Sequence, residues 1–119
     1  LTADAQQQTN RSPIGSKLEK FVRQHYAEDI GAKDLADCLY CSVSQVFRYT
    51  RKYYNFSPAN YINSIRLQQA EILLLNTEKT VSEIASAVGI ADGAYFSKVF
   101  RKYYGVSPSN YRKNFLSDH

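Results

Sequence analysis

The cationic side chains of this 119-residue chain are concentrated in two short segments that contain no acid. Residues 43–56 hold three of them and residues 93–106 hold three more: Arg48, Arg51, Lys52, Lys98, Arg101 and Lys102. Acid-free clusters of this kind bind polyanions, because guanidinium and ammonium groups pair with phosphate oxygens. The net charge of +4 is only a mild bias, so the clustering is what favours a nucleic-acid partner.

The two cationic segments belong to copies of one pattern. Residues 51–61 are RKYYNFSPANY and residues 101–111 are RKYYGVSPSNY, which agree at eight of eleven positions. A structural unit that occurs twice suits a partner with a repeat of its own. Double-stranded DNA repeats its major groove every ~34 Å, so it is the leading candidate.

Helical periodicity and capping patterns predict an all-α fold of seven helices. The pair Ser16 and Glu19 predicts that the first helix begins near residue 16, so that residues 1–15 form a flexible linker or arm. Ser42 and Thr80 each open a helix with a glutamine or glutamate three residues later. These starts predict two helix-turn-helix subdomains, at about residues 32–53 and 80–103.

A long central linker helix is expected between the two subdomains, at about residues 57–75, and Pro108 begins the last helix. The apolar residues of the linker helix lie on two sides, with Tyr61, Ile65 and Ile72 opposite Leu67, Ala70 and Leu74. A helix that is apolar on two sides is usually enclosed between two bodies. At ~1.5 Å per residue it would span about 27 Å, a little less than one turn of DNA.

Each subdomain should present its second helix as the recognition helix. Helical spacing predicts that one side of each faces inward, with Val46, Tyr49, Thr50 and Tyr53 in the first and Phe96, Val99, Phe100 and Tyr103 in the second. The remaining, mostly polar positions then face outward.

Several motifs together resemble the AraC/XylS-type DNA-binding domain of bacterial transcription regulators. They are Arg66-Leu67 with Ala70, Ile84-Ala85, Val88-Gly89, residues 95–100, residues 105–108 and Tyr111-Arg112. The resemblance extends over roughly residues 17–114. It implies two helix-turn-helix units whose recognition helices dock on one face of promoter DNA, and an effector-binding or dimerisation domain outside this chain.

The resemblance also implies which outward residues contact bases, and the helical pattern selects the same ones: Ser44, Gln45, Phe47, Arg48, Ala94, Tyr95, Ser97 and Lys98. Arginine can donate two hydrogen bonds to guanine, glutamine can pair with adenine, and Phe47 or Ala94 can pack on a thymine methyl. Tyr95 suits a base or a phosphate equally. The cations one turn further along suit phosphates: Arg51, Lys52, Arg101 and Lys102. The alternative for all these charges is an ordinary solvated helix face.

The first copy departs from the family pattern. Tyr40 stands where the second copy has Gly89, so a left-handed backbone conformation would cost it about 1 kcal/mol. Thr50 stands where the second copy has Phe100. In the second copy, Gly93 should weaken the first turn of the recognition helix. The base contacts of the first copy are therefore less firmly implied.

Cys38 and Cys41 form a single C-x-x-C, for which structural, redox and zinc roles are conceivable. Zinc would need two further ligands, and His25 and His119 are the only histidines. The second copy has Ala87 and Ile90 at these positions, which favours a structural role. Free cysteines fit a reducing cytosol, so a cytoplasmic location is expected.

Other classes of protein are disfavoured. No nucleotide-binding, zinc-protease or serine-hydrolase motif occurs, so no catalytic residue, metal ligand or cofactor is expected. The longest apolar run, residues 72–75, is far below the ~20 residues that cross a bilayer. The chain contains no methionine, which suggests a piece of a longer protein. The alternative function is a helix-turn-helix module that mainly contacts RNA polymerase or another regulator.

Overall fold

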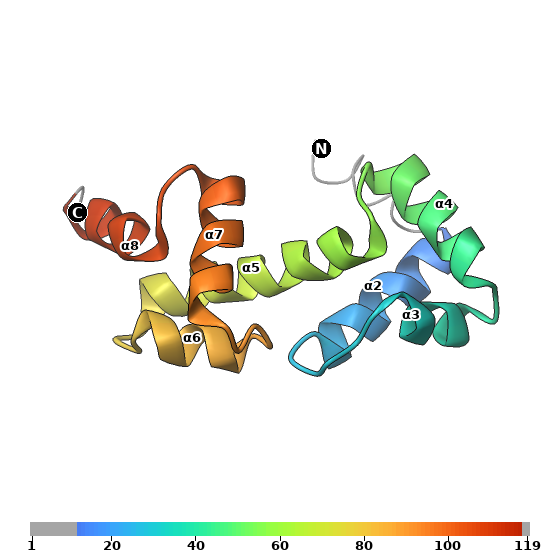
Figure 1. Ribbon diagram of the computed structural model, residues 1–119, viewed down its shortest axis with the longest axis horizontal. Helices are drawn as coiled ribbons and strands as arrows, with labels where there is room; N and C mark the ends of the chain where they lie inside the picture. The colour runs from blue at the N-terminus through green and yellow to red at the C-terminus, as the bar shows by residue number, and fades with distance from the viewer. Residues whose placement is uncertain (1–11, 118–119) are drawn as a thin grey trace. The chain divides into compact units, whose positions relative to one another are not determined.

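The computed structural model describes residues 12–117, in which there are seven helices and no strand, as the sequence predicted (Figure 1). The chain divides within the fourth of these helices into two compact units, Leu1–Ile65 and Arg66–His119. The helices are α2 (Pro13–His25), α3 (Ala32–Leu39), α4 (Val43–Tyr54), α5 (Pro58–Asn76), α6 (Val81–Ala87), α7 (Gly93–Tyr104) and α8 (Pro108–Ser117).

Three helices begin with the same dipeptide, a serine cap followed by proline. Ser12 Oγ accepts a hydrogen bond from the Gly15 amide at 3.0 Å, and Ser57 and Ser107 each cap the amide three residues on at 3.2 Å. Proline fits the next position because its missing N–H would have no helical partner there. The expected start at Ser16 is therefore wrong: α2 begins at Pro13, and residues 13–15 of the expected arm are helical.

The first unit packs α2, α3, α4 and the first half of α5 around one apolar core. The pairs α2 with α3 and α3 with α4 are in contact. The buried cluster comprises Leu18, Val22, Leu35, Ala36, Val46, Tyr61, Ile62 and Ile65. Each of these residues is at most 5% exposed, so the unit has a dry core of its own.

The second unit repeats this design with different residues. Its buried apolar side chains are Leu67, Ala70, Leu74, Ile84, Ala85, Val88, Ile90, Phe96 and Phe100. The second half of α5 thus supplies the apolar stripe that α2 supplies in the first unit. The predicted two-sided helix is explained by this division, because each half of α5 packs into its own unit. The expectation for Ile72 is wrong, since this side chain is 52% exposed on the outside of the second unit.

Both helix-turn-helix turns use a left-handed residue to end the first helix. Gly89 has φ 93°, and Tyr40 has φ 54° and ψ 45°. The following amides donate back to the preceding helix, from Cys41 to the Ala36 carbonyl and from Ile90 to the Ala85 carbonyl. Tyr40 therefore holds the costly conformation expected of it, with its ring 88% exposed and the Lys17 ammonium 4.6 Å from the ring centroid.

Hydroxyl groups of two tyrosines fasten α7 and α8 to α5 in the second unit. The Tyr104 hydroxyl donates to Glu71 Oε1 at 3.2 Å, and the Tyr111 hydroxyl donates to the other oxygen of the same carboxylate. The two rings lie 5.2 Å apart, and Tyr104 also stacks on Phe100 at 4.4 Å. Tyr54 and Tyr61 form the matching ring pair of the first unit at 4.7 Å.

These tyrosines make stability sensitive to alkali. Burial, and then the nearby Glu71 carboxylate, raise the pKa of Tyr104 above the ordinary value of 10.0, and burial raises the pKa of Tyr61. The folded protein therefore keeps protons that the unfolded chain loses above pH 10.0, so this contribution is complete below that pH and declines as the pH rises. We expect the free energy of unfolding in urea to fall as the pH rises above about 10. Tyr104→Phe should reduce this slope; a flat profile in the wild-type protein would contradict the prediction.

Candidate nucleic-acid interface

The outward faces of α4 and α7 carry nearly all the residues proposed from the sequence. Of the base-contact candidates, seven are exposed and Ser97 is half-buried. The four phosphate candidates, Arg51, Lys52, Arg101 and Lys102, are all exposed. Within each unit the structure therefore brings the candidates onto one helix surface, as helical spacing predicted.

The inward faces explain why these helices are oriented as they are. Val46 and Thr50 of α4 are 1% and 0% exposed, and Phe96 and Phe100 of α7 are both 0% exposed. Thr50 is accommodated in the core because its hydroxyl donates to the Phe47 carbonyl at 3.3 Å. This local bond satisfies the polar atom where the second unit has a phenylalanine ring.

The inward assignments of Tyr53 and Tyr103 are wrong. Their side chains are 44% and 37% exposed, and the next tyrosine in each pair turns inward instead. Tyr54 does so because it packs against the Tyr61 ring. Tyr53 then lies beside the cations of α4, with the Lys52 ammonium 5.2 Å from its ring centroid.

Gln45 has a structural duty that limits its chemistry. The side-chain oxygen of Gln45 accepts a hydrogen bond from the backbone amide of Ser42 at 2.9 Å. The backbone amide of Gln45 donates to Ser42 Oγ at 3.1 Å. This reciprocal capping box, predicted from the sequence, satisfies two amides at the start of α4. A two-bond contact with adenine needs both ends of the glutamine side chain, so Gln45 would have to give up this cap to make one.

The start of α7 is capped by an acid instead. Asp92 Oδ1 accepts from the amides of Ala94 and Tyr95 at 3.0 and 3.2 Å. The carboxylate suits the positive end of the helix but repels phosphate nearby. Cationic contacts from α7 must therefore come from further along, where Lys98, Arg101 and Lys102 lie.

The six cations of α4 and α7 have no carboxylate partner among residues 12–117. The ion pairs described there are both on α2 and just beyond it, Arg23 with Glu19 and His25 with Glu28. Cations in the last turn of a helix also interact favourably with its dipole, which is a purely structural reason for Arg51, Lys52, Arg101 and Lys102. That reason does not extend to Arg48 and Lys98, which lie near the middle of their helices.

Some relevant residues were not identified from the sequence. Val43, 41% exposed, lies one turn before Phe47 on α4 and adds apolar surface to the outward face of this helix. Glu71 and Arg112 help to hold the second unit together, since Arg112 donates to the carbonyls of Leu74 and Thr77 at 3.0 and 3.2 Å. The i to i+4 spacing of Val43 and Phe47 could have identified Val43 as an outward-facing residue. The long-range contacts of Glu71 and Arg112 have no local sequence pattern.

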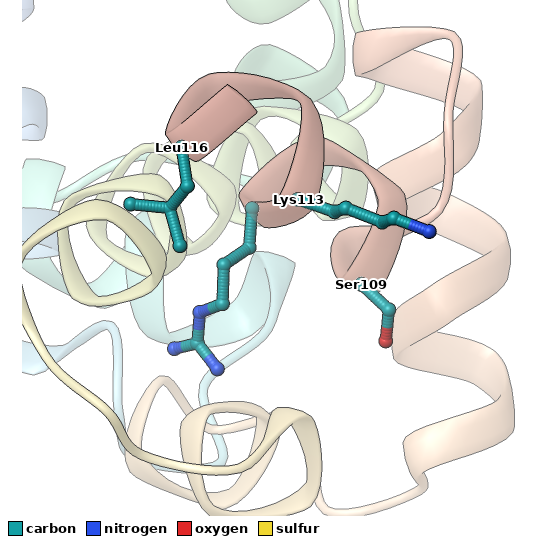
Figure 2. Close-up of a pocket in the computed structure, with 4 residues that line it drawn as sticks. Ser109, Lys113 and Leu116 are labelled. Carbon is teal, nitrogen blue, oxygen red and sulfur yellow. The ribbon is translucent and has the colours of Figure 1, made fainter. Parts of the chain in front are cut away.

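Shallow hollows occur on α4 and on α8. The one on α4, about 340 Å³, is lined by Phe47, Arg48, Arg51 and Lys52 and therefore coincides with the predicted site. The one on α8, about 370 Å³, is lined by Ser109, Arg112, Lys113 and Leu116 (Figure 2). Figure 2 shows Lys113 and Leu116 extending in different directions from α8. Because Arg112 donates to the carbonyls of Leu74 and Thr77, Ser109 and Lys113 are the remaining polar residues of this second hollow.

Cys38 and Cys41 are half-buried free thiols, and residues 12–117 hold no group of three or more potential metal ligands. The residues at the positions of Cys38 and Cys41 in the second copy differ in burial, because Ala87 is exposed and Ile90 is only 5% exposed. No helix in the described part of the chain has the length and apolar character needed to span a bilayer.

Comparison with known proteins identifies the family. A helix-turn-helix domain model matches residues 35–114, more than half of the chain. The Msm operon regulatory protein of Streptococcus mutans is 34% identical over 98 residues, which are 82% of this chain and 35% of that protein. The chain thus spans about a third of the length of this relative.

Solved structures agree with this assignment. The C-terminal domain of AraT, a response regulator from Geobacillus stearothermophilus, matches with a TM-score of 0.79 and 33% identity over 87% of this chain and 86% of that one. The DNA-binding domain of AdpA, solved with a target DNA, matches with a TM-score of 0.82 and 24% identity over 91% and 96% of the two chains, which shows a shared fold. The chain belongs to the AraC/XylS family of transcription regulators and is a helix-turn-helix DNA-binding domain of that family.

Proposed function

We propose that this domain binds specific promoter sequences by inserting α4 and α7 into successive segments of the major groove. The observation that carries the proposal is the repeated, carboxylate-free cationic face, three cations on each helix with no acidic partner among the described residues. Unpaired surface cations cost repulsion in the free protein, and a polyanion removes that cost. The nineteen residues of α5, about 28 Å of continuous helix at ~1.5 Å per residue, contribute to both units.

The proposed roles divide by position along each helix. Arg48 and Lys98 contact base edges together with Ser44, Phe47, Ala94 and Tyr95, because these side chains lie in the first half of each helix, the half that enters the groove in helix-turn-helix proteins. Gln45 contributes through its side-chain NH2 group. Ser97 contributes through its half-buried hydroxyl. Arg51, Lys52, Arg101 and Lys102 contact phosphates and fix the register without selecting bases.

Partners beyond DNA follow from the family and are also proposals. In a full-length regulator this domain would act with an effector-binding or dimerisation domain and would contact RNA polymerase at the promoter. Such a protein would work in the cytoplasm. Contact with polymerase would be an addition to DNA binding, since the unpaired cations favour a polyanion.

The two proposed classes of contact can be separated by two substitutions. Arg48→Ala should weaken binding to the preferred duplex by about 1–3 kcal/mol and relax the preference at one base pair. Arg101→Ala should weaken binding to preferred and shuffled duplexes alike, because a phosphate contact carries no sequence information. Gel-shift titrations of both variants on both duplexes provide the measurement. Equal, sequence-independent losses from the two variants would refute base contact by Arg48.

A further inference from the structure

The two recognition helices differ at the positions where their outward faces begin. With Arg51 matched to Arg101, Val43 and Phe47 of α4 are larger and more apolar than their counterparts in α7, whereas the counterpart of Gln45 is the larger tyrosine. The pairs are Val43 and Gly93, Gln45 and Tyr95, Phe47 and Ser97, and Arg48 and Lys98. The copies therefore share a scaffold and a cationic face but present different chemistry to the groove.

In α4 the difference takes the form of an exposed apolar strip. Val43 and Phe47 are one helical turn apart, and their side chains are 41% and 46% exposed. Phe47 also forms the apolar wall of the shallow hollow whose other lining residues are Arg48, Arg51 and Lys52. Exposed apolar surface enclosed by cations is unfavourable in water and marks a place where a partner supplies an apolar group.

The polar groups at this part of α4 are few. The oxygen of Gln45 is committed to the Ser42 amide, which leaves the side-chain NH2 of Gln45, the hydroxyl of Ser44 and Arg48 as the donors. In the major groove the pattern of donors and acceptors is interrupted by one apolar group, the methyl on C5 of thymine. The same methyl occurs on 5-methylcytosine.

We propose that Val43 and Phe47 make α4 a reader of a C5-methyl pyrimidine beside the base contacted by Arg48, a preference that α7 lacks at the matching positions. This inference rests on the proposed function, because it assumes that α4 enters the major groove. It makes Phe47 the residue that determines specificity for the methyl. Gly93 and Ser97 offer no apolar surface of comparable size, so α7 lacks such a contact at these two positions.

The test uses a duplex that the protein itself selects from a random pool. Each thymine is replaced in turn by deoxyuridine, which removes only the methyl, and Kd is measured for the wild-type protein and for Phe47→Ser. This substitution copies the residue found at position 97, and its site is exposed, so the fold is retained. We expect at least one thymine at which deoxyuridine weakens wild-type binding about fourfold, the value of one buried methyl. That loss should disappear in Phe47→Ser and persist in Phe47→Leu.

A second arm distinguishes the two sources of the methyl. At the sensitive position the T·A pair is replaced by C·G, with cytosine or 5-methylcytosine. Tighter binding of the methylated form by the wild-type protein and not by Phe47→Ser assigns the site to the methyl in either base; a deoxyuridine effect without this gain assigns it to thymine. Both outcomes support the inference.

The contrary results are equally distinct. If no thymine responds to deoxyuridine, or if the response is the same in Phe47→Ser, the inference fails while sequence-specific binding stands. If the selected duplex binds no better than a shuffled one, the proposed function fails first.

Discussion

Replacing Phe100 by alanine is expected to lower the free energy of unfolding by about 3–5 kcal/mol. The ring is fully buried at the centre of the second unit. It stacks on Tyr104 with centroids 4.4 Å apart and meets the edge of Tyr111 at 5.5 Å. Truncation would leave a cavity between α7 and the residues that fasten it, which the surrounding helices could fill only in part. Urea unfolding followed by circular dichroism measures the change.

The matched control is Phe47→Ala, the same deletion on the outward face of α4. Phe47 is 46% exposed, so its truncation should cost less than about 1 kcal/mol. If Phe100→Ala and Phe47→Ala cost the same, the assignment of inward and outward faces is refuted. An unchanged stability in Phe100→Ala would mean that α7 is rotated from the orientation described.

Raising the salt concentration from about 50 to about 200 mM is expected to weaken DNA binding about 150-fold. Each neutralised phosphate releases a condensed counterion, and neutralising about four of them gives a slope of about −3.6 in a plot of log K against log salt. The four cations assigned to phosphates have no carboxylate partner among residues 12–117, so they are available for this exchange. Fluorescence anisotropy titrations at several salt concentrations measure the slope.

Two arginine variants show whether the slope comes from the proposed face. Arg51→Ala should make the slope shallower by about 1, since one phosphate contact is lost. Arg23→Ala is the control, because Arg23 lies on α2 and is paired with Glu19 at 2.8 Å. A salt-independent affinity would contradict the interface and favour a module that contacts proteins.

Local patterns predicted the elements of the fold well, and they failed where two patterns competed. The capping boxes at Ser42 and Thr80 and the start of α8 at Pro108 were found from the sequence and are confirmed. At the first helix, Ser16 with Glu19 has the form of a capping box, yet Ser12 before Pro13 is the cap used. The other two Ser-Pro starts in the chain could have decided this.

The remaining errors concern contacts between elements. Tyr53 and Tyr54 both border the inward side of α4, and only the packing of Tyr61 decides that Tyr54 is the inward one. Ile72 fits the apolar periodicity of α5, but the helix changes from one unit to the other at residues 65 and 66, which no local pattern indicates. The outward positions of the site were predictable because they depend only on helical geometry.

The chemistry available at each site residue was less predictable than its position. Gln45 belongs both to the capping box and to the candidate base contacts. The sequence alone does not show that its side-chain oxygen is bonded to the Ser42 amide. The half-burial of Ser97 depends likewise on tertiary packing. Side-chain partners, rather than helix positions, therefore set the limit of the sequence-based interpretation.

The most direct test of the central claim is an interference experiment on a duplex selected by this domain. Guanines methylated at N7 and thymines replaced by deoxyuridine identify the base pairs whose major-groove edges are contacted. If α4 and α7 both enter the major groove, two short blocks of interference are expected, with centres about 10 base pairs apart, one helical turn. A single block, or two blocks on opposite faces of the duplex about half a turn apart, would contradict the claim.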